Sequence, residues 1–161
     1  MDALEVIREQ HDEVDRLFAK IEQSEDLTEK AELFTELGNK IAAHSRMEQE
    51  LFYPAANTKQ THELLVRFTE EHLSVYRILA DLLELEPSDE RFAAKLAVMK
   101  EQFVLHSRQE EEAVLMPQVE KVMTPEERDR LGDEMLARYD KVLLEGPGQQ
   151  VPEETEHAAP V

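Results

Sequence analysis

The sequence FTELGNKIAAHSRMEQELFYPA, residues 34–55, decides the fold class. Its inward-facing residues recur at alternating steps of three and four, and two of them, a histidine and a glutamate, are polar. The stripe consists of Phe34, Leu37, Ile41, His44, Glu48, Leu51 and Ala55. This period is typical of the seam of a helix bundle. The stretch therefore predicts a long helix, at about 28–56, with polar groups on its buried face.

Three other segments carry the same kind of stripe, and each stripe contains a histidine. The segment at about 2–23 has Leu4, Ile7, His11, Val14, Phe18 and Ile21. The segment at about 61–85 has Leu65, Phe68, His72, Val75, Leu79 and Leu82. The segment at about 88–123 has Phe92, Leu96, Met99, Phe103, His106, Glu110 and Ala113. Together the stripes predict an all-α protein, an antiparallel up-down-up-down four-helix bundle over residues 1–123.

The remaining chain divides into two parts. Thr124-Pro125-Glu126-Glu127 opens a short fifth helix at 124–144, with a cap, a proline at the first position and acid in the first turn. Residues 145–161 are rich in proline and glutamate and have no basic residue, which predicts a disordered acidic tail.

Four histidines and two glutamates in the stripes point to a metal. Buried carboxylates need a positive partner, and no lysine or arginine occupies the middle of any stripe. His44 and Glu48 are four residues apart, as are His106 and Glu110, so each pair faces one point from its helix. The midpoints between successive stripe histidines fall at the predicted connections, which places all six side chains in one layer.

The sequence also contains a repeat. HSRMEQE at 44–50 leads to Pro54, and HSRQEEE at 106–112 leads to Pro117. Each half of the chain supplies one lone histidine and one His-x-x-x-Glu motif. Four imidazoles and two carboxylates are too many for one tetrahedral zinc and suit two metals, iron first, with manganese and zinc behind it.

This series of residues on four helices resembles the haemerythrin-like (HHE cation-binding) family over about residues 1–123. The resemblance implies a non-haem di-iron centre with two oxo- or hydroxo-bridged iron ions. It implies that His11 and His44 hold one iron, that His72 and His106 hold the other, and that Glu48 and Glu110 bridge them.

One position departs from the oxygen-carrying members of that family. They have another histidine four residues after the ligand of the third helix, where this chain has Tyr76. Tyr76 is either a metal ligand or a tyrosine that packs or hydrogen-bonds nearby. The departure argues against simple oxygen carriage and favours chemistry of peroxide, nitric oxide or redox sensing. Four other glutamates, at 70, 71, 111 and 112, are expected mainly on solvated faces.

Composition narrows the function further. With 37 acidic and 18 basic residues the formal charge is −19, which argues against binding nucleic acid or an anionic membrane. No cysteine is present, so thiolate metal sites and iron–sulfur clusters are excluded. An acidic start and the lack of a long apolar run predict a cytoplasmic location. The sequence leaves the oligomeric state undetermined.

Three functions follow as hypotheses. The first is a di-iron protein that binds or reacts with a small oxidant, namely hydrogen peroxide, dioxygen or nitric oxide, with catalase-like disproportionation as one form. The second is a non-enzymatic module that senses or binds iron or oxygen. The third is a helix bundle without metal.

Overall fold

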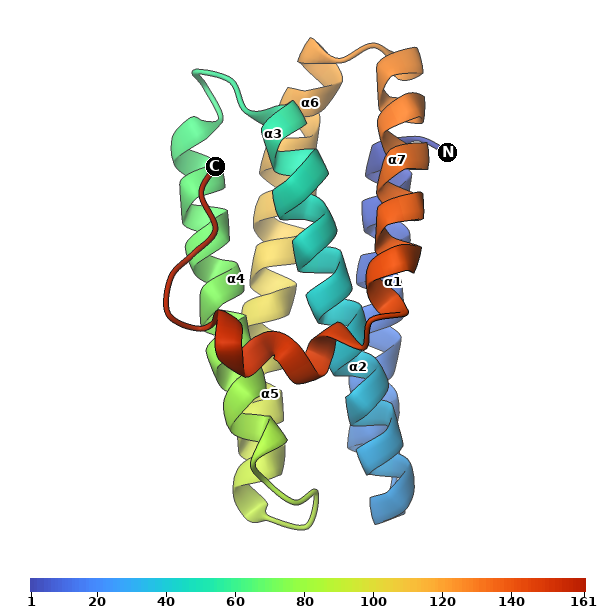
Figure 1. Cartoon of the computed structure of the whole chain (residues 1–161), viewed down its shortest axis with the longest axis vertical. Coiled ribbons are helices and arrows are strands. Elements are labelled where there is room, and N and C mark those ends of the chain that lie inside the picture. The colour runs from blue at the N-terminus through green and yellow to red at the C-terminus, as the bar shows by residue number, and fades with distance from the viewer.

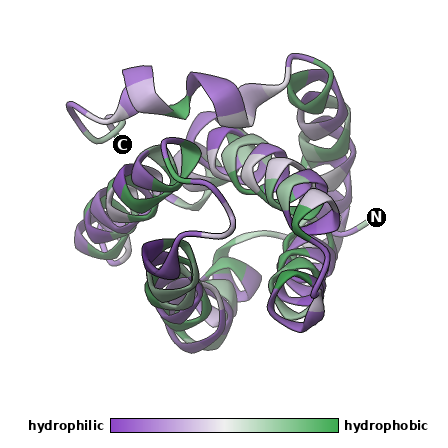
Figure 2. Cartoon of the chain, turned by 90° about the horizontal axis from the view of Figure 1, so that it is seen from below, coloured by the Kyte–Doolittle hydropathy of each residue, from purple (hydrophilic) through white to green (hydrophobic).

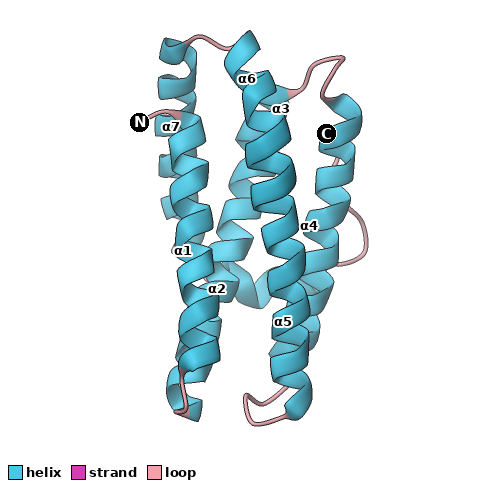
Figure 3. Ribbon diagram, turned by 180° about the vertical axis from the view of Figure 1, so that it is seen from behind, coloured by secondary structure: helices cyan, strands magenta, loops and turns pink.

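The computed structural model describes all residues, 1–161, and every regular element in it is helical (Figure 3). This confirms the all-α class. The long helices α1 (Ala3–Gln23), α2 (Leu27–Met47), α4 (His62–Leu83) and α5 (Glu90–Val104) run along the long axis of the molecule (Figure 1). None of the helices combines the length and the apolar character that crossing a bilayer requires.

Two of these helices change their winding partway along. α2 continues into a π-helical turn, η1 (Glu48–Phe52), and then into α3 (Tyr53–Ala56). α5 continues into a longer π-helical segment, η2 (Leu105–Leu115), and then into α6 (Met116–Val122). A π turn closes i→i+5 hydrogen bonds and so takes up more residues than an α turn. Side chains beyond each segment are therefore rotated relative to a continuous α-helical stripe.

Local sequence signals set the ends of the helices. Asp89 caps α5 by accepting a hydrogen bond from the backbone N–H of Arg91. Thr124 and Glu127 form a reciprocal capping box before α7 (Pro125–Leu143), where the sequence predicts a helix start. α7 packs along α1 and α2 (Figure 1).

The core consists of two apolar clusters on either side of a polar layer. One cluster includes Ile7, Met47, Phe68 and Met116, and the other includes Val14, Ile41, Val75 and Phe103. Each histidine of the stripes falls between a member of one cluster and a member of the other along its helix. In the end view, the hydrophobic side of each helix faces the interior (Figure 2). The layer between the clusters is thus shielded from water at both ends.

The C-terminal tail is ordered, which corrects the disorder expected for residues 145–161. A 3-10 helix, η3 (Pro147–Glu154), crosses the long helices and packs on α2 and α4 (Figure 1). Val151 is fully buried in the core, and Arg46 of α2 pairs with Glu154 at 2.7 Å. Acidic residues of the tail therefore pair with Arg46 on the bundle, and Val151 anchors the tail in the apolar core.

Candidate metal centre

Four histidines meet in the polar layer, one from each of α1, α2, α4 and η2. The rings of His11 and His44 lie 4.9 Å apart, and those of His72 and His106 lie 4.7 Å apart. The Nε2 atoms of the second pair approach to 3.0 Å. All four side chains are buried. The structure thus groups the histidines into the same two pairs that the family resemblance implies.

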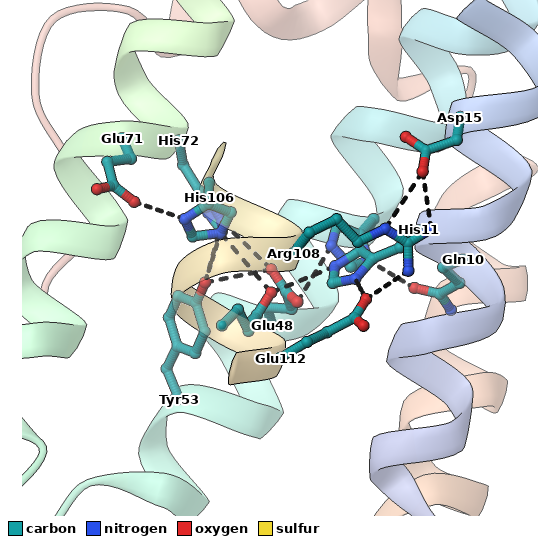
Figure 4. Close-up of polar contacts among 12 residues, drawn as sticks. Gln10, His11, Asp15, Glu48, Tyr53, Glu71, His72, His106, Arg108 and Glu112 are labelled. Carbon is teal, nitrogen blue, oxygen red and sulfur yellow. Dashed lines mark hydrogen bonds and ion pairs between the residues drawn. The ribbon is translucent and has the colours of Figure 1, made fainter. Parts of the chain in front are cut away.

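Glu48 lies between the two pairs (Figure 4). Its Oε1 is 3.1 Å from Nε2 of His44, and its Oε2 is 3.2 Å from Nε2 of His72. The side chain is fully buried. One carboxylate therefore reaches one histidine of each pair.

The second carboxylate of the layer is Glu111, which corrects the place expected for Glu110. Oε2 of Glu111 lies 3.3 Å from Nε2 of His11 and 3.7 Å from Nε2 of His106. Glu110 lies at the rim, where it pairs with Arg67 at 2.7 Å. The reason is the winding of η2, because in a π turn the residue five positions after His106 shares its face, and that residue is Glu111.

The sequence contains a signal for this shift. His44 precedes Pro54 by ten residues, whereas His106 precedes Pro117 by eleven. The second repeat therefore holds one extra residue. Aligned on the prolines, Glu48 corresponds to Glu111.

A tyrosine reaches the layer, but it is Tyr53 instead of Tyr76. The Tyr53 hydroxyl lies 3.0 Å from Nε2 of His72 and 3.3 Å from Oε2 of Glu48 (Figure 4). It follows η1, whose π winding turns residue 53 toward the same face as residue 48. The Tyr76 hydroxyl instead donates a hydrogen bond to the backbone carbonyl of Ala42 at 3.3 Å. Tyr76 is thus a packed tyrosine outside the histidine layer.

Burial and close contacts shift the pKa values of the layer's carboxyls and of His11 in different directions. Burial favours the neutral form of each carboxyl, yet the histidines His44 and His72 hold the pKa of Glu48 well below its usual range. Burial, and then repulsion from Glu48, raise the pKa of Glu111. Burial alone would lower the pKa of His11, but its contacts with Glu111 and with Glu112 raise it to about 9.

Several buried polar atoms of the layer have no hydrogen-bond partner. They are Nε2 of His11, Nε2 of His44, Oε1 of Glu48 and both carboxylate oxygens of Glu111. Such atoms are costly to bury, and every one of them belongs to a side chain that ligates transition metals. Metal-compatible groups form on both sides of Glu48: one with His11, His44 and Glu111, the other with His72 and His106. The donor set therefore fits two metal ions that share Glu48.

The outward nitrogen of every histidine has a fixed partner. Nδ1 of His11 contacts Glu112 at 2.6 Å, and Nδ1 of His106 contacts Glu71 at 2.6 Å. The side-chain amide of Gln10 holds Nδ1 of His44 at 2.7 Å, and that of Gln49 holds Nδ1 of His72 at 3.0 Å. These contacts direct all four Nε2 atoms inward, which is the usual second-layer support of histidine ligands. The two glutamates, at 71 and 112, thus contact ligand candidates instead of lying on the solvated faces expected of them.

Two arginines balance these outer carboxylates. Arg108 donates to Glu112 at 2.6 Å and also pairs with Asp15 at 2.7 Å (Figure 4). Arg67 pairs with Glu71 at 3.3 Å on the other side of the layer. Arginines thus pair with the carboxylates behind the histidines, whereas the ion-pair partners of Glu48 and Glu111 inside the layer are histidines.

Comparison with known proteins agrees with this geometry. The family model described as the Hemerythrin HHE cation binding domain matches residues 2–119. The crystal structure of a Hemerythrin HHE cation binding domain-containing protein from Mycobacterium kansasii is similar with a TM-score of 0.79 and 28% identity, over 90% of this chain and 89% of that one. A protein from Nostoc sp. named DNA nickase is 25% identical over 149 residues, 92% of this chain. The chain spans only 42% of the length of that relative.

Proposed function

This chain belongs to the haemerythrin HHE cation-binding domain family, and we propose that its polar layer is a non-haem di-iron centre that binds or reacts with a small oxidant. One observation carries the proposal: Glu48 and Glu111 each reach one histidine of both pairs, and their inward oxygens include atoms without a partner. Two cations between the pairs would satisfy these atoms and compensate both buried carboxylates.

The histidine pairs define two metal positions. His11 and His44 would hold the first position, and His72 and His106 would hold the second. Glu48 and Glu111 would serve both positions. Mixed nitrogen and oxygen ligation suits iron, with manganese and zinc as the alternatives.

The protein's part in the chemistry is to bind the metals, to orient their ligands and to shield the site from water. When bound, a pair of irons supplies Lewis acidity and a two-electron redox couple, which suits hydrogen peroxide, dioxygen or nitric oxide as a reactant. Phe103 packs edge-on against the ring of His11, and Phe68 packs edge-on against that of His106. These rings keep bulk water from the layer. Because the histidines are almost inaccessible to solvent, only a small reactant fits the site.

The catalase-like form of the proposal has a direct test. Protein loaded with iron under anaerobic conditions is mixed with hydrogen peroxide, and released oxygen is measured against free iron at the same concentration. We expect faster oxygen release by the loaded protein. Turnover no faster than that of free iron would exclude peroxide disproportionation and leave binding or sensing of a small oxidant.

A second candidate function is a non-enzymatic iron or oxygen sensor, and the buried charge favours it. Two carboxylates in one core destabilise the metal-free fold, so stability should depend on metal occupancy. A large iron-dependent change in melting temperature and proteolysis without turnover would support this candidate over an enzyme.

Other expectations from the sequence remain predictions. The pairing of α1 with α2 and of α4 with α5 supports the antiparallel four-helix arrangement. A formal charge of −19 argues against carrying over DNA nicking from the Nostoc relative, because phosphate backbones require basic surfaces. The cytoplasmic location is testable by cell fractionation.

A further inference from the structure

Tyr53, for which the sequence analysis predicts no role, faces the second metal position. Its hydroxyl oxygen lies 3.0 Å from Nε2 of His72, 3.3 Å from Nε2 of His106 and 3.3 Å from Oε2 of Glu48. These three atoms all belong to residues proposed to hold the metal at the second position. The ring is buried and stacks on His72 with centroids 5.5 Å apart.

The hydrogen bonds of this hydroxyl depend on the layer holding no metal. An Nε2 atom that ligates a metal has no lone pair left for a hydroxyl, and the inward oxygen of Glu48 would face the same cation. If a metal engaged these acceptors, the phenol oxygen would be left beside the same metal position. Phenol oxygen is a donor that iron accepts, as in haem proteins with a tyrosine axial ligand.

Only the first of the two repeats has a tyrosine at this place. Aligned on Pro54 and Pro117, the residue that corresponds to Tyr53 in the second half of the chain is Met116, a buried core residue. A thioether in that place supplies no hard oxygen donor. The first and second positions therefore differ by one oxygen atom, although their histidines and carboxylates match.

We propose that Tyr53 is an oxygen ligand of the metal at the second position, which makes the two metal positions chemically unequal. This inference rests on the proposed metal centre and concerns its ligand set. On binding iron(III) as a phenolate, the hydroxyl loses its proton to the solvent buffer. The metal at the first position keeps one more site free for a reactant.

The test is spectroscopic and does not depend on activity. Wild type, Tyr53→Phe and Tyr76→Phe are loaded with iron(III), their metal content is measured, and their absorption and resonance Raman spectra are recorded. Phenolate bound to iron(III) gives a visible charge-transfer band with enhanced tyrosine ring modes. We expect the band in wild type and in Tyr76→Phe, and its loss in Tyr53→Phe.

Tyr53→Phe is a conservative probe, because the ring keeps its packing against Phe68, at 6.0 Å between centroids, and loses one oxygen. If this variant does not fold, the chain's other two tyrosines decide the question: a band that survives in both Tyr76→Phe and Tyr139→Phe assigns it to Tyr53. Wild type that carries two irons without the band, or a band retained in Tyr53→Phe, overturns the inference. Wild type that binds no metal overturns the proposed centre instead.

Discussion

Glu110 and Glu111 are neighbours in sequence with opposite surroundings. Glu110 is tied to Arg67 at the rim, while Glu111 is fully buried beside His11. We expect Glu111→Gln to weaken metal binding by more than about 100-fold, the upper end of the effect of a ligand's supporting partner. Anaerobic competition with a chromophoric chelator measures it. The matched variant Glu110→Gln should bind as wild type does, and equal losses in both variants would contradict the assignment.

The same substitution should act in the opposite direction on the metal-free protein. Glu111 carries a carboxyl that burial and Glu48 push toward its neutral form. Glu111→Gln removes that unfavourable charge, so the melting temperature of the metal-free variant should exceed that of metal-free wild type. A lower melting temperature would show that the carboxylate stabilises the empty layer. Calorimetry in the presence of a chelator decides between the two.

Glu112 tests the support of a histidine from outside. It holds Nδ1 of His11, a task that the neutral amide of Gln10 performs for His44. Glu112→Ala should weaken metal binding about 10- to 100-fold. Glu112→Gln should lose less, because an amide can still orient the ring. If both variants bind alike, the contact does not set the orientation of His11.

Single residues were predictable where the helix stayed regular. His11, His44 and His72 lie in α-helical stretches, and Glu48 and His106 lie at the start of the π segments. A stripe with spacings of three and four residues therefore places all five side chains in the layer. Glu111 and Tyr53 come after the change of winding, and no residue preference announces a π turn. The available signal for Glu111 was the spacing from histidine to proline, which is one residue longer in the second repeat than in the first.

At the scale of elements, the stretch from His106 to Pro117, which contains η2, is one residue longer than the stretch from His44 to Pro54. Gln109 is exposed and lies between His106 and Glu111 in the longer repeat. Deleting Gln109 gives the second repeat the length of the first and sets Glu111 four residues after His106. We expect this deletion variant to keep two metal equivalents, measured by elemental analysis of the purified protein, and to keep its helix content by circular dichroism. A loss of half the metal or more would mean that the layer requires the full η2 winding.

The helices themselves follow from local signals that tertiary contacts reinforce. The cap at Thr124 and the apolar stripes place their ends within a few residues, because both depend on neighbouring residues alone. The tail was not predictable in this way. Its order depends on Arg46 and on the space that Val151 fills, which only the folded bundle provides.

For the whole molecule, metal binding and folding should be one equilibrium. A metal present at 100 times its dissociation constant stabilises the native state by about 2.7 kcal/mol. For a chain of this size that corresponds to a rise in melting temperature of roughly 5–10 °C. Differential scanning calorimetry with and without iron(II) under anaerobic conditions checks it. The absence of any shift would mean that the empty layer and the loaded layer are equally stable, which the two buried carboxylates argue against.

Removing the tail should lower the stability of the protein without changing how much metal it binds. A variant ending at Leu144 loses the burial of Val151, worth about 1.5–3 kcal/mol, while the ion pairs of Arg46 add little. We expect lower resistance to urea with unchanged metal stoichiometry. A truncated variant that folds but cannot hold metal would show that the tail takes part in the centre.

The position of the tail also has a consequence for the order of synthesis. Every candidate ligand, from His11 to Glu111, leaves the ribosome before η3 does. η3, which packs across α2 and α4, is made after both helices, and the pairing of Arg46 with Glu154 spans 108 residues of chain. A nascent chain can therefore gather its ligands while the side of the bundle beside Gln49 is still uncovered.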